Sequence, residues 1–140
     1  MQVSAAIAGE DDSQTKYNVT VKNNGTSGLT GFSARVYVDL SEVFAAGKTA
    51  TCVERYDPVA FTCTLVQYSG NVYYANLNYG TYSLAAGASI EYKITVRTSD
   101  FSGFWNPAND YSRAGLTATY SVTTRIPVYQ GTTLLSGTNP

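Results

Sequence analysis

Apolar and polar residues alternate along several stretches of this chain, and this period of two constrains the fold more than any other feature of the sequence. Between residues 90 and 97, isoleucine, tyrosine, isoleucine and valine alternate with glutamate, lysine, threonine and arginine. Similar alternation runs through residues 17–22, 32–38 and 116–122. Because successive side chains of a strand point to opposite faces of a sheet, the pattern predicts half-buried β-strands.

The rest of the chain fits the same architecture. A tyrosine-rich strand is expected at 72–79 and short strands around Ile126 and Leu134, while only residues 40–47 have room for a helical turn or two. Gly- and Asn-rich turns separate these segments. At 140 residues the chain is long enough for one domain with a real core. We therefore predict a single all-β domain over residues 1–140, an antiparallel, jelly-roll-like β-sandwich of about eight or nine short strands.

Composition excludes several classes of function. A net charge of −1 with only 14% charged residues does not indicate the basic surface that binding to nucleic acid or an anionic membrane requires. No apolar stretch approaches the roughly 20 residues of a membrane span. The absence of histidine removes the commonest general base and the usual zinc ligand. Nothing in the sequence pairs two carboxylates as the acid and base of a glycosidase, so we predict that the protein is not an enzyme.

The segment 104–112, Phe-Trp-Asn-Pro-Ala-Asn-Asp-Tyr-Ser, places a turn proline and oxygen-bearing side chains in one loop. Asn106, Asn109 and Asp110 offer oxygen ligands of the type that calcium takes. The same residues also suit an ordered loop pinned by buried aromatics, because Asn and Asp side chains cap turns. The loop alone leaves both interpretations open.

Three motifs together resemble a known family. They are Arg-Val-Tyr-Val-Asp-Leu-Ser-Glu-Val at 35–43, the loop 104–112, and Arg-Ile-Pro-Val-Tyr at 125–129. With the same segments in the same order, the chain resembles the family 3 carbohydrate-binding modules from about residue 17 to its last residue. The first two motifs are most similar to those of modules fused to family 9 cellulases.

This resemblance implies one structural calcium ion between the end of the 35–38 strand and the loop 104–112. The implied ligands are oxygens of Asp39, Ser41 or Glu42, Asn106 or a nearby carbonyl, Asn109 and Asp110. Such a set reaches the six to eight oxygens that calcium prefers.

The resemblance also implies a flat sheet face that recognises cellulose or a related β-1,4-glucan. Arg97 matches the arginine of the family's planar strip, and Phe101 stands where the strip carries a tryptophan. Glu54 is the nearest acidic partner for Arg97, and Tyr56 the nearest further aromatic. Stacking on sugar rings from a rigid sheet loses little entropy on docking.

Departures from the family pattern keep an alternative open. The loop after Arg97 is shorter than usual, and the family's Asp-His pair is absent near Cys52. The alternative is a helper module that packs on a family 9 catalytic domain and guides a single glucan chain, or a sensor or scaffold ectodomain. In each case we expect a module excised from a larger extracellular protein, secreted or on the cell surface, with glucan and a catalytic domain as partners.

Cys52 and Cys63 are the only cysteines and flank a turn signal at Tyr56-Asp57-Pro58. A hairpin between residues 49–53 and 61–66 would bring them into register. A disulfide there contributes about 3 kcal/mol in the chain-entropy model, whereas buried free thiols are the usual state in the cytosol. We expect the disulfide, because a secreted polysaccharide binder works in an oxidising setting.

Overall fold

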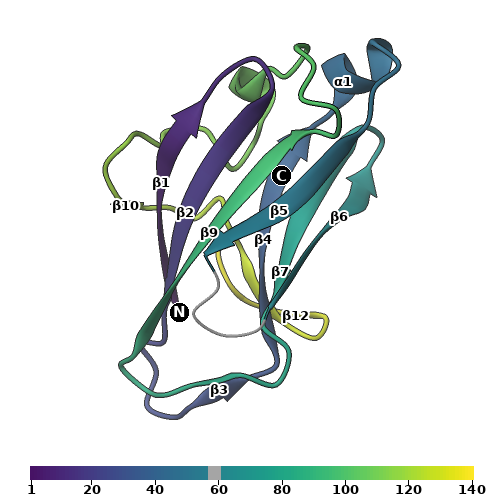
Figure 1. Cartoon of the computed structure of the whole chain (residues 1–140). Helices are drawn as coiled ribbons and strands as arrows, with labels where there is room; N and C mark the ends of the chain where they lie inside the picture. Colours follow the sequence, from purple (N-terminus) through teal and green to yellow (C-terminus); the bar gives the residue numbers. More distant parts are fainter. Residues whose placement is uncertain (57–60) are drawn as a thin grey trace.

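The alternating segments form two five-stranded antiparallel sheets that stack face to face (Figure 1). The computed structural model describes residues 1–56 and 61–140. The first layer, called the β9 sheet, has the order β10-β1-β2-β9-β5. Its strands are β1 (Gln2–Glu10), β2 (Gln14–Lys22), β5 (Ala50–Tyr56), β9 (Ser89–Thr98) and β10 (Ser121–Val122).

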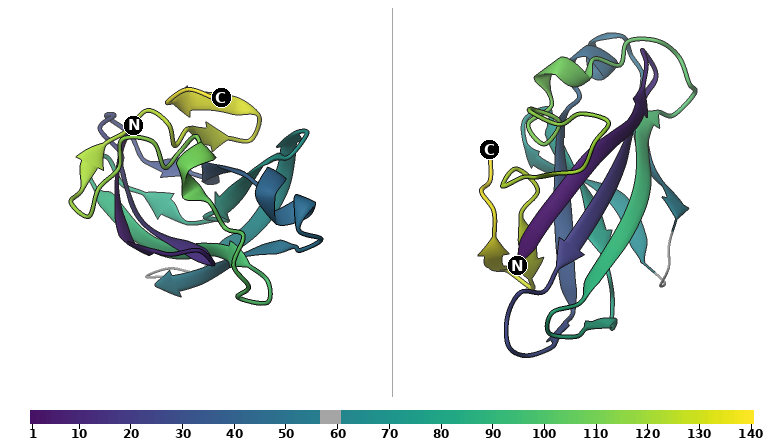
Figure 2. Two further views of the ribbon diagram at one scale, coloured as in Figure 1. Left: turned by 90° about the horizontal axis from the view of Figure 1, so that it is seen from above. Right: turned by 90° about the vertical axis from the view of Figure 1, so that its left-hand side faces the viewer.

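The second layer, called the β4 sheet, has the order β12-β11-β4-β7-β6. Its strands are β4 (Phe32–Asp39), β6 (Thr62–Ser69), β7 (Val72–Asn78), β11 (Val128–Gln130) and β12 (Thr133–Ser136). A two-stranded ribbon pairs β3 (Leu29–Thr30) with β8 (Ser83–Leu84). The yellow C-terminal hairpin lies on the side of the molecule opposite β9 and β5 (Figure 2). The prediction of an all-β antiparallel sandwich is confirmed.

The core lies between the sheets, where alternate residues of β2, β4 and β9 are buried. Val19 of β2, Ile94 of β9 and Val36 of β4 are fully buried. Tyr79 and Tyr92 stack within this core with ring centroids 3.9 Å apart. Part of the chain's tyrosine content therefore belongs to the interior and not to a binding surface.

Two short helices lie at one end of the sandwich. Helix α1 (Ser41–Ala45) follows β4, as the 40–47 segment predicted, and the 3₁₀ helix η1 (Pro107–Asn109) lies in the loop 104–112. Trp105 pins this loop because its buried indole Nε1 donates to Thr15 Oγ1 at 2.9 Å. No helix in the described part of the chain is long and apolar enough to cross a membrane.

Three local expectations were wrong. The described residues contain twelve strands, more than the eight or nine expected, because pairings as short as two residues leave no periodic signal. Of residues 116–122, only the last two form a strand: Leu116 ends a turn, and the side chains of 117–122 are exposed. The segments around the cysteines do not form a hairpin, because β5 pairs with β9 and β6 pairs with β7. The expected turn at Asp57 and Pro58 lies outside the described residues.

Candidate functional site

The outer face of the β9 sheet is a grid of polar side chains set by unbroken pairing between β2 and β9. This register runs from Gln14 opposite Arg97 to Lys22 opposite Ser89. On the other side of β9, Thr51 of β5 lies opposite Arg97. Since residues opposite each other share a face, the polar halves of the alternating segments point away from the β4 sheet.

Arg97 and Phe101 form one end of this face. The guanidinium carbon of Arg97 lies 3.9 Å from the centroid of the Phe101 ring. Phe101 is 62% exposed, so its ring is not part of the core. Arginine stacked on an exposed aromatic contributes about 0.5–1 kcal/mol and leaves the opposite face of the ring free for a ligand.

Tyr56 lies on the edge strand β5, opposite Lys93 across the β5–β9 pairing. The ammonium nitrogen of Lys93 is 5.5 Å from the centroid of the Tyr56 ring, and Tyr56 is 46% exposed. Both aromatics predicted for a ligand-binding face, Phe101 and Tyr56, are thus exposed, and each is paired with a cation of β9.

Glu54 does not pair with Arg97, contrary to expectation. Its Oε1 accepts a hydrogen bond from the backbone N–H of Cys63 at 2.9 Å. Glu54 lies opposite Ile94, a core residue, so its side chain is directed toward β6 and not toward the outer face. Arg97 instead donates from Nη1 to the backbone carbonyl oxygens of residues 98 and 99, at 3.0 and 2.8 Å.

Sequence reasoning did not place Arg55, Glu91, Lys93 or Tyr120 in the binding face. A bulge between Glu54 and Tyr56 interrupts the pairing at Arg55, whose guanidinium donates to the Tyr17 carbonyl oxygen at 3.1 Å and to Asn18 Oδ1 at 2.9 Å. The Tyr120 hydroxyl donates to a carboxylate oxygen of Glu91. Partial burial, followed by this bond, raises the pKa of Tyr120 to about 12.

We call the resulting row the strip face. It consists of Arg55, Tyr56, Glu91, Lys93, Arg97, Phe101 and Tyr120. No local sequence signal links Tyr120 to it, because that residue comes from a loop 29 positions after Glu91. The strip face offers three exposed aromatic rings and several hydrogen-bonding groups on a sheet, which suits a flat ligand with apolar faces and polar edges.

The second predicted site lies where the loop 104–112 meets the end of β4. Asp110 is buried, and its Oδ1 accepts a hydrogen bond from the Asp39 backbone N–H at 2.8 Å. Its Oδ2 is buried and has no hydrogen-bond partner among the described residues. Burial, with the nearby charges of Glu42 and Asp39 adding to it, raises the pKa of Asp110 to about 8.

The other predicted ligands surround Asp110 but already accept hydrogen bonds. Glu42 accepts from the Asn106 backbone N–H and from Asn109 Nδ2, both at 3.0 Å. Asp39 Oδ1 accepts from the N–H and hydroxyl of Ser41. Asn106 Oδ1 caps η1 by accepting from the N–H of residue 108. Residues 1–56 and 61–140 contain no group of three or more Asp, Glu, Cys or His side chains placed to hold a metal ion.

Cys52 and Cys63 are joined in a disulfide, with Cα atoms 5.7 Å apart. Cys52 belongs to β5 and Cys63 to β6, which are edge strands of different sheets. The bond therefore connects the two layers directly behind the strip face, which a hairpin disulfide would not do.

Comparisons with known proteins point to one family. The sequence profile described as cellulose binding domain matches residues 2–137. Endoglucanase A of Bacillus pumilus is 33% identical over 150 residues, which cover 99% of this chain and 23% of that protein. The chain thus spans about a quarter of the length of the curated relatives that it matches.

Solved structures agree with the profile. Endoglucanase CelQ from Clostridium thermocellum, complexed with cellotriose, matches with a TM-score of 0.90 and 25% identity, covering 99% of this chain and 26% of CelQ. The carbohydrate-binding module CBM3b of cellobiohydrolase 9A from the same organism matches with a TM-score of 0.82 and 19% identity, covering 98% and 95% of the two chains. The second likeness supports the fold alone.

Proposed function

The chain belongs to the family of cellulose binding domains, the family 3 carbohydrate-binding modules, and from that premise we propose that its strip face binds the flat side of a β-1,4-glucan. Membership confirms the resemblance of the three sequence motifs. The family is non-catalytic, so the prediction that this module is not an enzyme is also confirmed.

The exposed Phe101 ring, stacked on Arg97, carries the proposal. Glucose rings of cellulose present C–H groups on their faces and hydroxyls at their edges. The free side of Phe101, with Tyr56 and Tyr120 in the same row, matches the faces. Arg97 and Lys93 can hydrogen-bond to the hydroxyls, and the sheet keeps these groups fixed before the ligand arrives.

Retention on microcrystalline cellulose, with soluble glucans as competitors, tests the proposal. We expect Arg97→Ala and Tyr56→Ala to weaken retention about tenfold each, as for central anchors of an interface, with the melting temperature little changed. Thr64→Ala, an exposed change on β6, is the control. Retention should tolerate added salt, because no phosphates are neutralised. If wild-type protein stays in the supernatant and soluble glucans do not bind, the assignment fails.

The relatives favour a second role beside this one. Because the chain covers only about a quarter of the endoglucanases that it matches, we propose a catalytic domain in a larger extracellular protein as its partner. In that setting the strip face would guide a single glucan chain toward the catalytic domain. A module that stays unbound over crystalline cellulose, yet raises the processivity of a fused cellulase, would support this helper role over anchoring.

We also propose one structural calcium ion beside Asp110. The residues fit a hard cation in kind: a buried carboxylate oxygen has no partner, and two further carboxylates, Asp39 and Glu42, lie close enough to raise the pKa of Asp110. Asn109 adds a side-chain oxygen in the same loop. Asp39 and Glu42 would share their remaining lone pairs with the ion, which would tie β4, α1 and the loop 104–112 together.

Thermal unfolding with calcium and with a chelator tests this site. An ion present at about one hundred times its Kd stabilises the folded state by about 2.7 kcal/mol. Asp110→Asn should remove most of the response to calcium, whereas Asp12→Asn, an exposed change on another loop, should keep it. A melting temperature that is the same with calcium and with chelator would count against the ion.

A further inference from the structure

Two phenylalanines have a backbone conformation that this residue type rarely adopts. Among the described residues, Phe101 (φ 58°) and Phe104 (φ 80°) are the only non-glycine residues with positive φ. The left-handed region is disfavoured for a residue with a Cβ atom, and it is a genuine outlier for a bulky side chain. Glycine would occupy the same turn without strain.

Neither burial nor packing compensates Phe101 for this strain. It is 62% exposed, the most exposed of the large hydrophobic side chains in the described part of the chain. Its ring contacts a cation, Arg97, and leaves one face in water. A strained and exposed aromatic indicates a role outside the stability of the fold.

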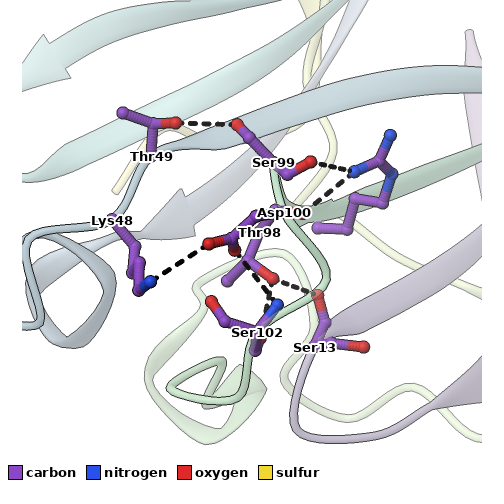
Figure 3. Close-up of polar contacts among 8 residues, drawn as sticks. Ser13, Lys48, Thr49, Thr98, Ser99, Asp100 and Ser102 are labelled. Atoms are coloured by element: carbon purple, nitrogen blue, oxygen red, sulfur yellow. Dashed lines mark hydrogen bonds and ion pairs between the residues drawn. The ribbon is translucent and has the colours of Figure 1, made fainter.

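Polar contacts hold the turn around Phe101 in place (Figure 3). Asp100 Oδ1 accepts from the Ser102 backbone N–H at 3.1 Å, and Asp100 Oδ2 forms an ion pair with Lys48 Nζ at 3.1 Å. Thr98 Oγ1 donates to the Ser102 carbonyl oxygen at 2.8 Å. The Phe101 backbone N–H also donates to the Thr98 carbonyl oxygen, at 3.2 Å, so Phe101 directly follows the two central turn residues, 99 and 100, and hydrogen bonds close the turn on both sides of it.

The same contacts fix the turn to the rest of the molecule. Lys48 comes from the segment between α1 and β5, and its neighbour Thr49 donates from Oγ1 to Ser99 Oγ at 2.8 Å (Figure 3). Arg97 Nη1 donates to carbonyl oxygens at the base of the turn. One turn thus holds both groups: its carbonyl oxygens accept hydrogen bonds from the Arg97 guanidinium, and its backbone carries the Phe101 ring.

We propose that Asp100 and Lys48 are positioning residues for glucan binding, which hold the Phe101 ring over Arg97 in the plane of the strip face. This role rests on the proposed glucan-binding function. Without the Asp100 contacts, residue 101 is released toward ordinary backbone angles, and the ring leaves Arg97. The ligand then has to order the ring on binding, which weakens affinity even though no direct contact is deleted.

The decisive experiment is a double-mutant cycle on cellulose retention. Ordering one side chain corresponds to a loss of about two- to tenfold in affinity, so Asp100→Ala and Lys48→Met should each weaken retention by that factor. Asp100→Ala should have no further effect in a Phe101→Ala background. Asp100→Asn, which keeps the acceptor for Ser102, should recover part of the loss. Glu10→Gln, which breaks the other close ion pair, with Arg113, is the control and should leave retention unchanged.

Two further measurements distinguish a failure of the positioning role from a failure of the proposed glucan-binding function. Phe101→Gly should lose retention while its melting temperature stays equal or rises, because strain is relieved. In NMR spectra, the ring-current shift of the Arg97 side chain should disappear in Asp100→Ala. If wild-type protein binds glucan but Asp100→Ala binds equally well, or keeps the Arg97 shift, the positioning role is overturned. If wild-type protein binds no glucan, the proposed function has failed, and the positioning role fails with it.

Discussion

The two outer faces of this sandwich both carry aromatic side chains, but only one leaves them free. On the strip face, Tyr56, Phe101 and Tyr120 project separately, and the first two stack on cations of β9. On the β4 sheet, a group that we call the tyrosine face packs against itself. It consists of Tyr37, Tyr68, Tyr74, Tyr111 and Tyr129.

The tyrosine face already has its partners within the chain. Tyr37 contacts the rings of Tyr68, Tyr74 and Tyr111, with ring centroids between 5.0 and 6.1 Å apart. The C-terminal segment lies over this sheet (Figure 2), and Asn139 Oδ1 accepts from the Tyr37 and Tyr129 hydroxyls at 3.1 and 2.9 Å. The number of tyrosines on a surface therefore does not indicate ligand binding; exposed rings that are not packed against other rings do.

The largest effect that separates the two faces should come from Tyr37, which is fully buried at the centre of the tyrosine face. Tyr37→Ala removes a large buried ring, so we expect the free energy of unfolding to fall by about 3–5 kcal/mol in urea denaturation. Cellulose retention per folded molecule should stay the same. Tyr37→Phe, which deletes only the bond to Asn139, should cost about 0.5–1.5 kcal/mol. A selective loss of retention in Tyr37→Phe would show that the tyrosine face also binds ligand.

The bond between Cys52 and Cys63 should have the next largest effect, because it ties the sheets of the two faces together. The double variant Cys52→Ala/Cys63→Ala should lose about 3 kcal/mol of unfolding free energy. Mass spectrometry of unreduced, alkylated protein checks the premise directly: two modified thiols would contradict it. Retention should fall more in this variant than in Tyr37→Phe, since Cys52 lies on the strand that carries Tyr56.

Local sequence patterns predicted the two sheets of this fold, whereas long-range pairing decided which of the alternating segments became strands. The alternation at 90–97 needed only neighbouring residues to identify β9, and the Asp39 and Asp110 motifs are brought together as expected. Residues 116–122 also alternate, yet only Leu116 among them is buried, and the Thr117 carbonyl oxygen accepts a bond from the Ile7 N–H outside any strand ladder. Period-two spacing without burial on one side does not make a strand.

The strip face, too, was predictable only where it depends on residues that are near in sequence. Arg97 and Phe101 are near in sequence and match positions of the family's strip, so both were expected on this face, although the stacking of one on the other was not. Glu54 and Tyr56 are two residues apart and would share a face in a regular strand, but the bulge between them places them on opposite faces, and the sequence carries no signal for that bulge. The contact of Tyr120 with Glu91 depends on the path of a loop, for which the sequence has no period.

Tyr120 and Tyr68 offer a matched test of the two faces, because they are 39% and 41% exposed. We expect Tyr120→Ala to weaken cellulose retention about five- to tenfold, since it deletes one stacking ring of the strip face. Tyr68→Ala should leave retention unchanged, because its ring contacts Tyr37 and not the ligand. Equilibrium binding isotherms of both variants give the comparison. Equal losses for the two would mean that the faces do not differ in the way proposed.

The smallest expected difference is the response of the two faces to acid. Ser102, and then Lys48, hold the pKa of Asp100 well below its usual range. A depressed folded-state pKa gives a stabilising contribution that is complete above the unfolded value, near 3.9, and is lost as pH falls through the folded value. The strip face should therefore keep Phe101 in place at pH 4 and release it only in stronger acid.

In Lys48→Met, the pKa of Asp100 should move back toward its ordinary value, and cellulose retention should begin to fall at a higher pH than in the wild-type protein. An NMR titration of the Asp100 carboxyl in the two proteins measures this shift, with the Tyr37 ring signals of the tyrosine face as the internal reference. Identical titration curves would show that Lys48 does not stabilise the charged form of Asp100.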